Sequence, residues 1–271
     1  MILLRITSAN LDETVKLNRK IENEIQRHIA FMNRHLAKYE IHSPEKQALQ
    51  ILKDHYLIQL PIPDPDWGGA IRELPNGEKV PVINTAQPRL YQYFICWHEI
   101  YHLTVDNLPV VSHEISTEFD LTERKADYFA SQMLISKDLY PYFYHLKEEK
   151  FIHRAAICMD LFKAPYKAIL IQLYESAITY QNTTLQEEIK ANFDLTFSVT
   201  DWIRLFKQLS LDENLVKPSY TVDFGLLKYL AEEKEKERPD DRVYEETGQY
   251  ILKLEKKFLD VKGKLERGKL S

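Results

Sequence analysis

Two histidines placed four residues apart constrain this chain more than any other feature of its sequence. They bound the segment His98-Glu99-Ile100-Tyr101-His102, which lies in a helix-patterned run from 90 to 104. On an α-helix, side chains four residues apart differ by about 40° in direction and about 6 Å in height. His98 and His102 therefore project from one face and can converge on a single metal ion. Glu99 lies about 100° round from His98, where its carboxylate can accept a proton from a metal-bound water.

A second, acidic motif follows the histidines after a gap of 20 residues. Glu123-Arg124-Lys125-Ala126-Asp127 opens another helix-patterned run, expected from 123 to about 135. Catalytic zinc takes three protein ligands and keeps a fourth position open for water, and two histidines with one glutamate are a known set. Glu123 is the predicted third ligand of a Zn²⁺ ion. Asp127, one turn further along, is predicted to accept the outer ring N–H of a ligating histidine and so to fix its orientation.

The predicted fold class is α+β, with a small twisted sheet against which the two motif-bearing helices pack. Short apolar or β-branched runs at 57–62, 70–74 and 79–83 predict three strands, and Asn76-Gly77 predicts a hairpin turn between the last two. Pro81 lies inside the third run. Because proline cannot donate to a strand ladder, we expect this strand to be at an edge or to end irregularly.

The remaining chain has mainly helical periodicity. Apolar residues at three- and four-residue intervals predict an amphipathic helix over 11–40, and Ser43-Pro44-Glu45 predicts the start of a second helix that ends near 55. These two helices lack the tight glycine-containing turn of a helix-turn-helix, so we expect no direct binding of nucleic acid. Residues beyond 150 predict a largely helical C-terminal region.

The end of the chain allows two interpretations. Residues 232–238 form a mixed-charge run, and residues 244–265 have the pattern of a charged helix with sparse apolar positions. One interpretation is a solvated helix face or a dangling tail, and the other is a helix that binds a partner or dimerises.

Charge and composition exclude several classes of protein. The chain has 36 basic and 41 acidic side chains and a net charge of -5, so it has no overall positive field that would attract nucleic acid or an anionic membrane. Neither a signal sequence nor a membrane-spanning run of about 18 apolar residues is evident, and we expect a cytoplasmic protein. Cys96 and Cys158 have no CxxC spacing and are expected to be reduced thiols.

The motifs together resemble those of the ImmA/IrrE family of zinc metallo-endopeptidases, whose sites are similar in design to those of the gluzincins. The resemblance covers about residues 45 to 136. It includes Val82-Ile83-Asn84 as a strand ending in Asn, Phe94-Ile95-Cys96-Trp97 before the histidine motif, and Tyr128-Phe129-Ala130-Ser131-Gln132-Met133-Leu134-Ile135 after the acidic motif. Many relatives have Leu-Gly in place of Ile100-Tyr101, and the usual proline after the second leucine is replaced by Ser136.

The resemblance implies a function and a partner. It implies zinc ligation by His98, His102 and Glu123, with Glu99 as the general base of peptide hydrolysis. Family members are often carried by mobile elements or prophages, and they relieve repression by removing a helix-turn-helix repressor. The expected protein is therefore a zinc metallopeptidase with an antirepressor role and a transcriptional repressor as its substrate.

The implied organisation has four parts. Residues 1–44 form an N-terminal helical segment, 45–148 the peptidase core, 149–231 a helical C-terminal region, and 232–271 a charged helical tail. The oligomeric state stays open.

Several points stay open at this level. The alternative to an enzyme is a non-catalytic, zinc-stabilised regulatory protein that acts by binding its partner. The group that stabilises the transition state also stays open, and the side chains that could do so are Tyr91, Tyr93, Tyr101, Tyr140 and His113. Asp106, one turn after His102, is either a further acceptor for that histidine or an ordinary polar residue at the end of the helix.

Overall fold

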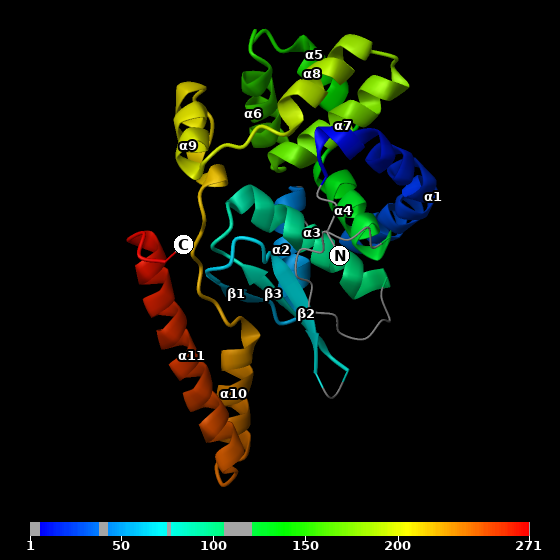
Figure 1. Cartoon of the computed structure of the whole chain (residues 1–271). Helices are drawn as coiled ribbons and strands as arrows, with labels where there is room; N and C mark the ends of the chain where they lie inside the picture. The colour runs from blue at the N-terminus through cyan, green and yellow to red at the C-terminus, as the bar shows by residue number, and fades with distance from the viewer. Residues whose placement is uncertain (1–5, 38–42, 75–76, 106–120, 271) are drawn as a thin grey trace. The chain divides into compact units, whose positions relative to one another are not determined.

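A computed structural model describes residues 6–37, 43–74, 77–105 and 121–270 of the chain (Figure 1). It confirms the predicted α+β class, since a small three-stranded sheet accompanies many helices. The chain divides into two compact units: a helical unit of Met1–Gln47 and Ser116–Lys217, and a sheet unit of Ala48–Ile115 and Pro218–Ser271. The four-part division stays a prediction. Within the described ranges, no helix combines the length and apolar character needed to cross a membrane.

The helical unit contains most of the helices, and their bounds agree with the periodicity of the sequence. Its elements are the 3-10 turn Ser8–Asn10, α1 (Leu11–Leu36), α4 (Leu121–Leu134), α5 (Leu139–His145), α6 (Phe151–Phe162), α7 (Tyr166–Thr179), α8 (Thr183–Phe193), α9 (Val199–Gln208) and the 3-10 turn Glu213–Val216. The stripe predicted for α1 is buried at Val15, Ile21, Ile25, Met32 and Leu36. Burial of this stripe is the main physical reason why such a long, otherwise charged segment is helical.

Polar contacts fix α4 to its two neighbours in the helical unit. The buried Arg124 guanidinium donates from Nε to Asn18 Oδ1 of α1 at 2.9 Å. On the other side, the Tyr128 hydroxyl donates to Glu175 Oε1 of α7 at 3.3 Å. Burial raises the pKa of the Glu175 carboxyl above its usual range, even though the Tyr128 hydroxyl donates to it. The helix that carries the acidic motif is thus held from two sides.

The sheet unit contains the three predicted strands: β1 (Ile58–Leu60), β2 (Gly69–Glu73) and β3 (Lys79–Asn84). Their order is β1-β3-β2; β1 is parallel to β3, and β2 pairs antiparallel with β3. The predicted hairpin is therefore confirmed. In its turn, Gly77 has a φ of 82°, a conformation that glycine adopts without strain, whereas Asn76 lies outside the described residues.

Of the two alternatives expected for Pro81, the edge strand is wrong, because β3 is the central strand. Asn84 N–H donates to Gly68 C=O, so Asn84 directs its backbone groups toward β2. Because successive residues of a strand direct their backbone groups to opposite sides, the nitrogen of Pro81, three residues earlier, faces β1. Pairing with β1 begins only at Val82, opposite Ile58. Proline has no N–H to donate, and none is required at position 81, because β1 is paired with β3 only from the next residue onward.

A buried amide organises the chain where β3 ends. Asn84 is fully buried; its Oδ1 accepts from the backbone N–H groups of Ile62 (3.0 Å) and Ala86 (2.9 Å). Its Nδ2 donates to the carbonyls of Asp64 (3.2 Å) and Trp67 (2.8 Å). One side chain thus ties the 61–68 loop to the turn that leads into α3 (Arg89–Val105).

The end of the chain packs on the sheet unit and is not a dangling tail. Helices α10 (Leu226–Glu237) and α11 (Arg242–Glu266) form a hairpin (Figure 1), which we call the C-terminal hairpin. Ala231 and Ile251 of this hairpin share a buried cluster with Leu60 of β1. The charged pattern of this segment corresponds to its outer surface, which leaves one apolar face for the sheet.

A segment whose pairing the sequence did not predict, residues 218–223, bonds to the outer edge of β1 and to the chain that follows β3. Gln59 and Asp223 exchange both backbone hydrogen bonds, at 2.7 and 2.9 Å, and Tyr220 N–H donates to Thr85 C=O at 2.9 Å. Gly225 follows with a φ of 54°, and a Cβ there would lie 2.5 Å from the carbonyl oxygen of Leu57. Only glycine fits this close approach.

We predict that Asn84→Ala destabilises the protein by about 1–3 kcal/mol, because it leaves four partly buried backbone groups without the side chain that bonds to them. Urea unfolding measures the change. Gln50→Ala is the control, since Gln50 makes a single exposed side-chain hydrogen bond to Asp54 and its loss should cost less than about 0.5 kcal/mol. Equal losses in the two variants would contradict the role given to Asn84.

We predict that Glu175→Gln is more stable than the wild type at neutral pH. The pKa of Glu175 is raised in the folded state by burial, so its ionisation opposes folding; this cost grows as the pH rises above the ordinary carboxyl pKa and is complete above the folded-state pKa. Below the ordinary carboxyl pKa the wild-type side chain is protonated and the difference should vanish. Unfolding free energies measured from acid to neutral pH test this, and a stability difference that grows toward acid pH would refute it.

Candidate metal centre

Helix α3 places the two motif histidines in direct contact inside the sheet unit. Leu90, Trp97, Ile100 and Tyr101 of this helix are buried, so the helix has little exposed surface and also holds His98 and His102 in the interior. The two histidines are 7% and 3% exposed, and their Nε2 atoms lie 3.2 Å apart. The predicted projection from one helix face is confirmed.

The separation of the two nitrogens suits ligation of one ion. Two zinc–nitrogen bonds of about 2.0–2.1 Å at a tetrahedral angle place the nitrogens roughly 3.3–3.4 Å apart, close to the observed 3.2 Å. The same distance also suits a hydrogen bond between the rings when one Nε2 carries a proton. The distance alone therefore does not distinguish these arrangements, and a third ligand is needed.

Glu123 provides that third group. It lies in the first turn of α4 and is only 8% exposed. Each of the three buried side chains, His98, His102 and Glu123, offers one ligand atom, and these atoms lie within 4.8 Å of one another. They are close enough to bind a metal ion, and the set of two imidazoles and one carboxylate is of a kind that zinc favours.

Glu99, the predicted base, lies next to His98 on α3 and is 1% exposed. Its carboxylate faces the start of β2: a Cβ built on Gly69 would lie 3.0 Å from Glu99 Oε1. The sequence points to Glu99 through its place in the motif, but it does not indicate this neighbour. The Gly68-Gly69 pair looks like a turn in the sequence, whereas in the structure it lets β2 pack closely on α3.

Asp127, the predicted partner of a ligating histidine, lies one turn after Glu123. Its carboxylate forms an ion pair with Arg124 at 3.7 Å, and its side chain is 37% exposed. The two partners lie three residues apart on α4, and the ion pair directs the Asp127 carboxylate toward the buried Arg124 guanidinium. Its role toward a histidine stays a prediction.

The side chains considered as stabilisers of the transition state differ in their surroundings. Tyr101 is buried and lies edge-to-face on the His102 ring, with the ring centroids 5.8 Å apart. Tyr140 accepts a hydrogen bond from Asn182 and stacks on Tyr180, so it has a structural function in the helical unit. Asp106 and His113 lie outside the described residues.

Cys96 is not among the three side chains that the structure groups as candidate ligands. It is fully buried on α3, and burial, together with the charge of Glu99, raises the pKa of its thiol far above the usual range. A raised thiol pKa favours the neutral form, whereas nucleophilic attack requires the thiolate. This agrees with its predicted role as an ordinary reduced cysteine.

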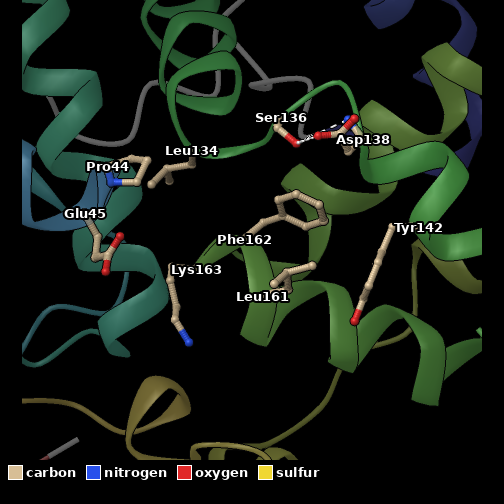
Figure 2. Close-up of a pocket in the computed structure, with 9 residues that line it drawn as sticks. All are labelled: Pro44, Glu45, Leu134, Ser136, Asp138, Tyr142, Leu161, Phe162 and Lys163. Carbon is tan, nitrogen blue, oxygen red and sulfur yellow. Dashed lines mark hydrogen bonds between the residues drawn. The ribbon is translucent and has the colours of Figure 1, made fainter. Parts of the chain in front are cut away.

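The helical unit also contains a pocket of about 350 Å³, shown in Figure 2. Its lining residues are Pro44, Glu45, Leu134, Ser136, Asp138, Tyr142, Leu161, Phe162 and Lys163. Ser136 and Asp138 hydrogen-bond to each other at its rim, and none of the predicted site residues lines it. The pocket is therefore separate from the chemistry that the motifs predict.

Comparison with known proteins identifies no relative of this chain. No family model, curated protein or solved structure matches it.

Proposed function

We propose that this chain is a zinc-dependent metallo-endopeptidase. The observation that carries the proposal is the grouping of three buried side chains, His98, His102 and Glu123, with their ligand atoms within 4.8 Å. Buried histidines and carboxylates need a partner that offsets their loss of hydration, and a divalent cation is such a partner. Three protein ligands also leave a fourth position for water, as in catalytic zinc sites.

The chain's own residues have distinct tasks in this proposal. Bound zinc would supply a Lewis acid that polarises the scissile carbonyl and lowers the pKa of a water molecule. His98 and His102 would hold the ion through a ring nitrogen each, and Glu123 would hold it through a carboxylate oxygen. Glu99 accepts the proton of the water and passes it to the leaving amine, and its burial keeps this carboxylate close to the reaction and away from bulk solvent.

The free outer edge of β2 favours a peptide as the substrate. The backbone groups of Ala70 and Arg72 bond to β3, so alternation directs those of Gly69 and Ile71 toward the outer edge of β2. Within the described residues no strand pairs with that edge. An extended peptide that adds to it as a further strand would pass beside Glu99, which neighbours Gly69.

The partner that we propose is a protein, and the resemblance to the ImmA/IrrE family favours a helix-turn-helix repressor. Co-expression of the chain with repressors encoded beside its gene tests this choice. Loss of one repressor in the presence of the wild-type chain identifies the substrate, and cleavage of a different protein keeps the hydrolase but changes its substrate.

We predict about one zinc ion per chain in protein purified without added metal, and loss of this zinc in both His98→Ala and Glu123→Ala. Elemental mass spectrometry measures the metal content. His153→Ala is the control, because this histidine of α6 is not part of the group of three and its removal should leave the metal content unchanged. A wild-type protein that takes up no zinc, even when zinc is supplied, would contradict the proposed site.

We predict that Glu99→Gln lowers peptide hydrolysis by about 10²-fold or more and retains zinc, since the amide cannot accept the proton while the ligands are intact. The measurements are cleavage of the co-expressed repressor and metal content. Cleavage at the wild-type rate would show that Glu99 is not the base. A zinc-bound variant that cleaves nothing but still relieves repression would favour the non-catalytic regulator.

A further inference from the structure

The start of β2 lies against the helix that carries the proposed base. A Cβ added to Gly69 would stand 2.8 Å from Ile95 Cγ2, 3.0 Å from Glu99 Oε1 and 3.1 Å from the carbonyl oxygen of Val82. All three distances are shorter than ordinary van der Waals contact. The Glu99 carboxylate therefore borders the space that any side chain at position 69 would need.

We propose that Gly69 is a positioning residue for Glu99, an inference that rests on the proposed peptidase function. The Glu99 carboxylate ends a side chain with three rotatable bonds, and a base must be held close to the proton that it accepts. The backbone of β2 at Gly69 forms the wall that limits this rotation. A glycine is required at the wall because its lack of a side chain lets strand and carboxylate approach each other.

Hydrogen bonds fix the β2 backbone on both sides of Gly69. Asn84 N–H donates to Gly68 C=O at 2.8 Å, and Asn84 Nδ2 donates to Trp67 C=O at 2.8 Å. On the other side of Gly69, Ala70 pairs with Val82 of β3. Since the backbone is fixed before and after Gly69, an added methyl group has little freedom to retreat, and the Glu99 and Ile95 side chains must move.

The neighbouring glycine provides a matched control. A Cβ added to Gly68 would lie 2.8 Å from Ile95 Cδ1 and 3.0 Å from Ile95 Cγ1, and no atom of Glu99 is among its nearest contacts. Neither glycine has a positive φ, so the backbone dihedral angles themselves allow alanine at both positions. Gly68→Ala thus strains the same isoleucine as Gly69→Ala, and neither the Glu99 carboxylate nor the carbonyl oxygen of Val82 is among its nearest contacts.

The first test uses thermal unfolding and does not depend on activity. We expect Gly69→Ala to lower the Tm of the wild type, and to lower it less when Glu99 is replaced by Ala, because the second substitution removes Glu99 Oε1, one of the three atoms that the methyl group meets, while Ile95 Cγ2 and the carbonyl oxygen of Val82 remain. Gly68→Ala should lower the Tm equally in both backgrounds. If Gly69→Ala does not fold, recovery of a folded protein in the Gly69→Ala/Glu99→Ala double variant is the same result. Equal effects of Gly69→Ala in both backgrounds would overturn the inference.

The second test uses kinetics of the zinc-loaded protein on its cleaved substrate. Gly69→Ala should lower kcat about tenfold or more with unchanged zinc content and little change in KM, since it displaces the base and retains the ligands. Gly68→Ala should keep kcat within about twofold. An equal loss of kcat in both variants would reduce Gly69 to a packing residue.

The two tests separate this inference from the proposed function. If the wild type binds zinc and cleaves no peptide while the Tm values show the expected coupling, the peptidase proposal fails and Gly69 still positions Glu99. If Glu99→Gln abolishes cleavage while Gly69→Ala shows neither coupling nor loss of kcat, the peptidase stands and the positioning role fails.

Discussion

The sheet unit depends on the four hydrogen bonds of one buried amide. Asn84 replaces the strand partners that the backbone lacks where β3 ends, and it bonds to both the incoming 61–68 loop and the outgoing turn toward α3. Since a side-chain amide has two donor and two acceptor positions in fixed geometry, it joins these segments in a single arrangement. Asn84 bonds to Trp67, two residues before the glycine that borders Glu99. It also bonds to Ala86, three residues before the start of the helix that carries both histidines.

Local patterns made most elements predictable from the sequence. The three strands and the two motif-bearing helices follow from apolar periodicity, and the pairing of the two histidines follows from helix geometry alone. The contribution of Glu123 depends on tertiary structure, and it was predictable only because zinc chemistry requires a third ligand. These features were predictable because each depends on residues close together in the sequence or, for Glu123, on the number of ligands that zinc requires.

The remaining features depend on long-range contacts that leave no local signal. Proline is typical of an edge strand, but Pro81 lies in the central strand β3, because the pairing of β3 with β1 starts only at the next residue, Val82. Residues 218–223 have no strand-like alternation, yet Asp223 pairs with Gln59 of β1 because the edge offers unsatisfied backbone groups. Gly69 resembles any turn glycine, and its significance lies in the atoms of Ile95 and Glu99, about 30 residues further along the chain.

The contact between Asp223 and β1 has a consequence for biosynthesis. The sheet is built from residues 58–84, but its outer edge and one of its apolar clusters are completed by residues that are synthesised much later, from 218 onward. A nascent chain that already contains both motifs of the candidate metal site therefore still exposes an open strand edge. The order of translation thus delays closure of the sheet unit until the C-terminal hairpin has been synthesised.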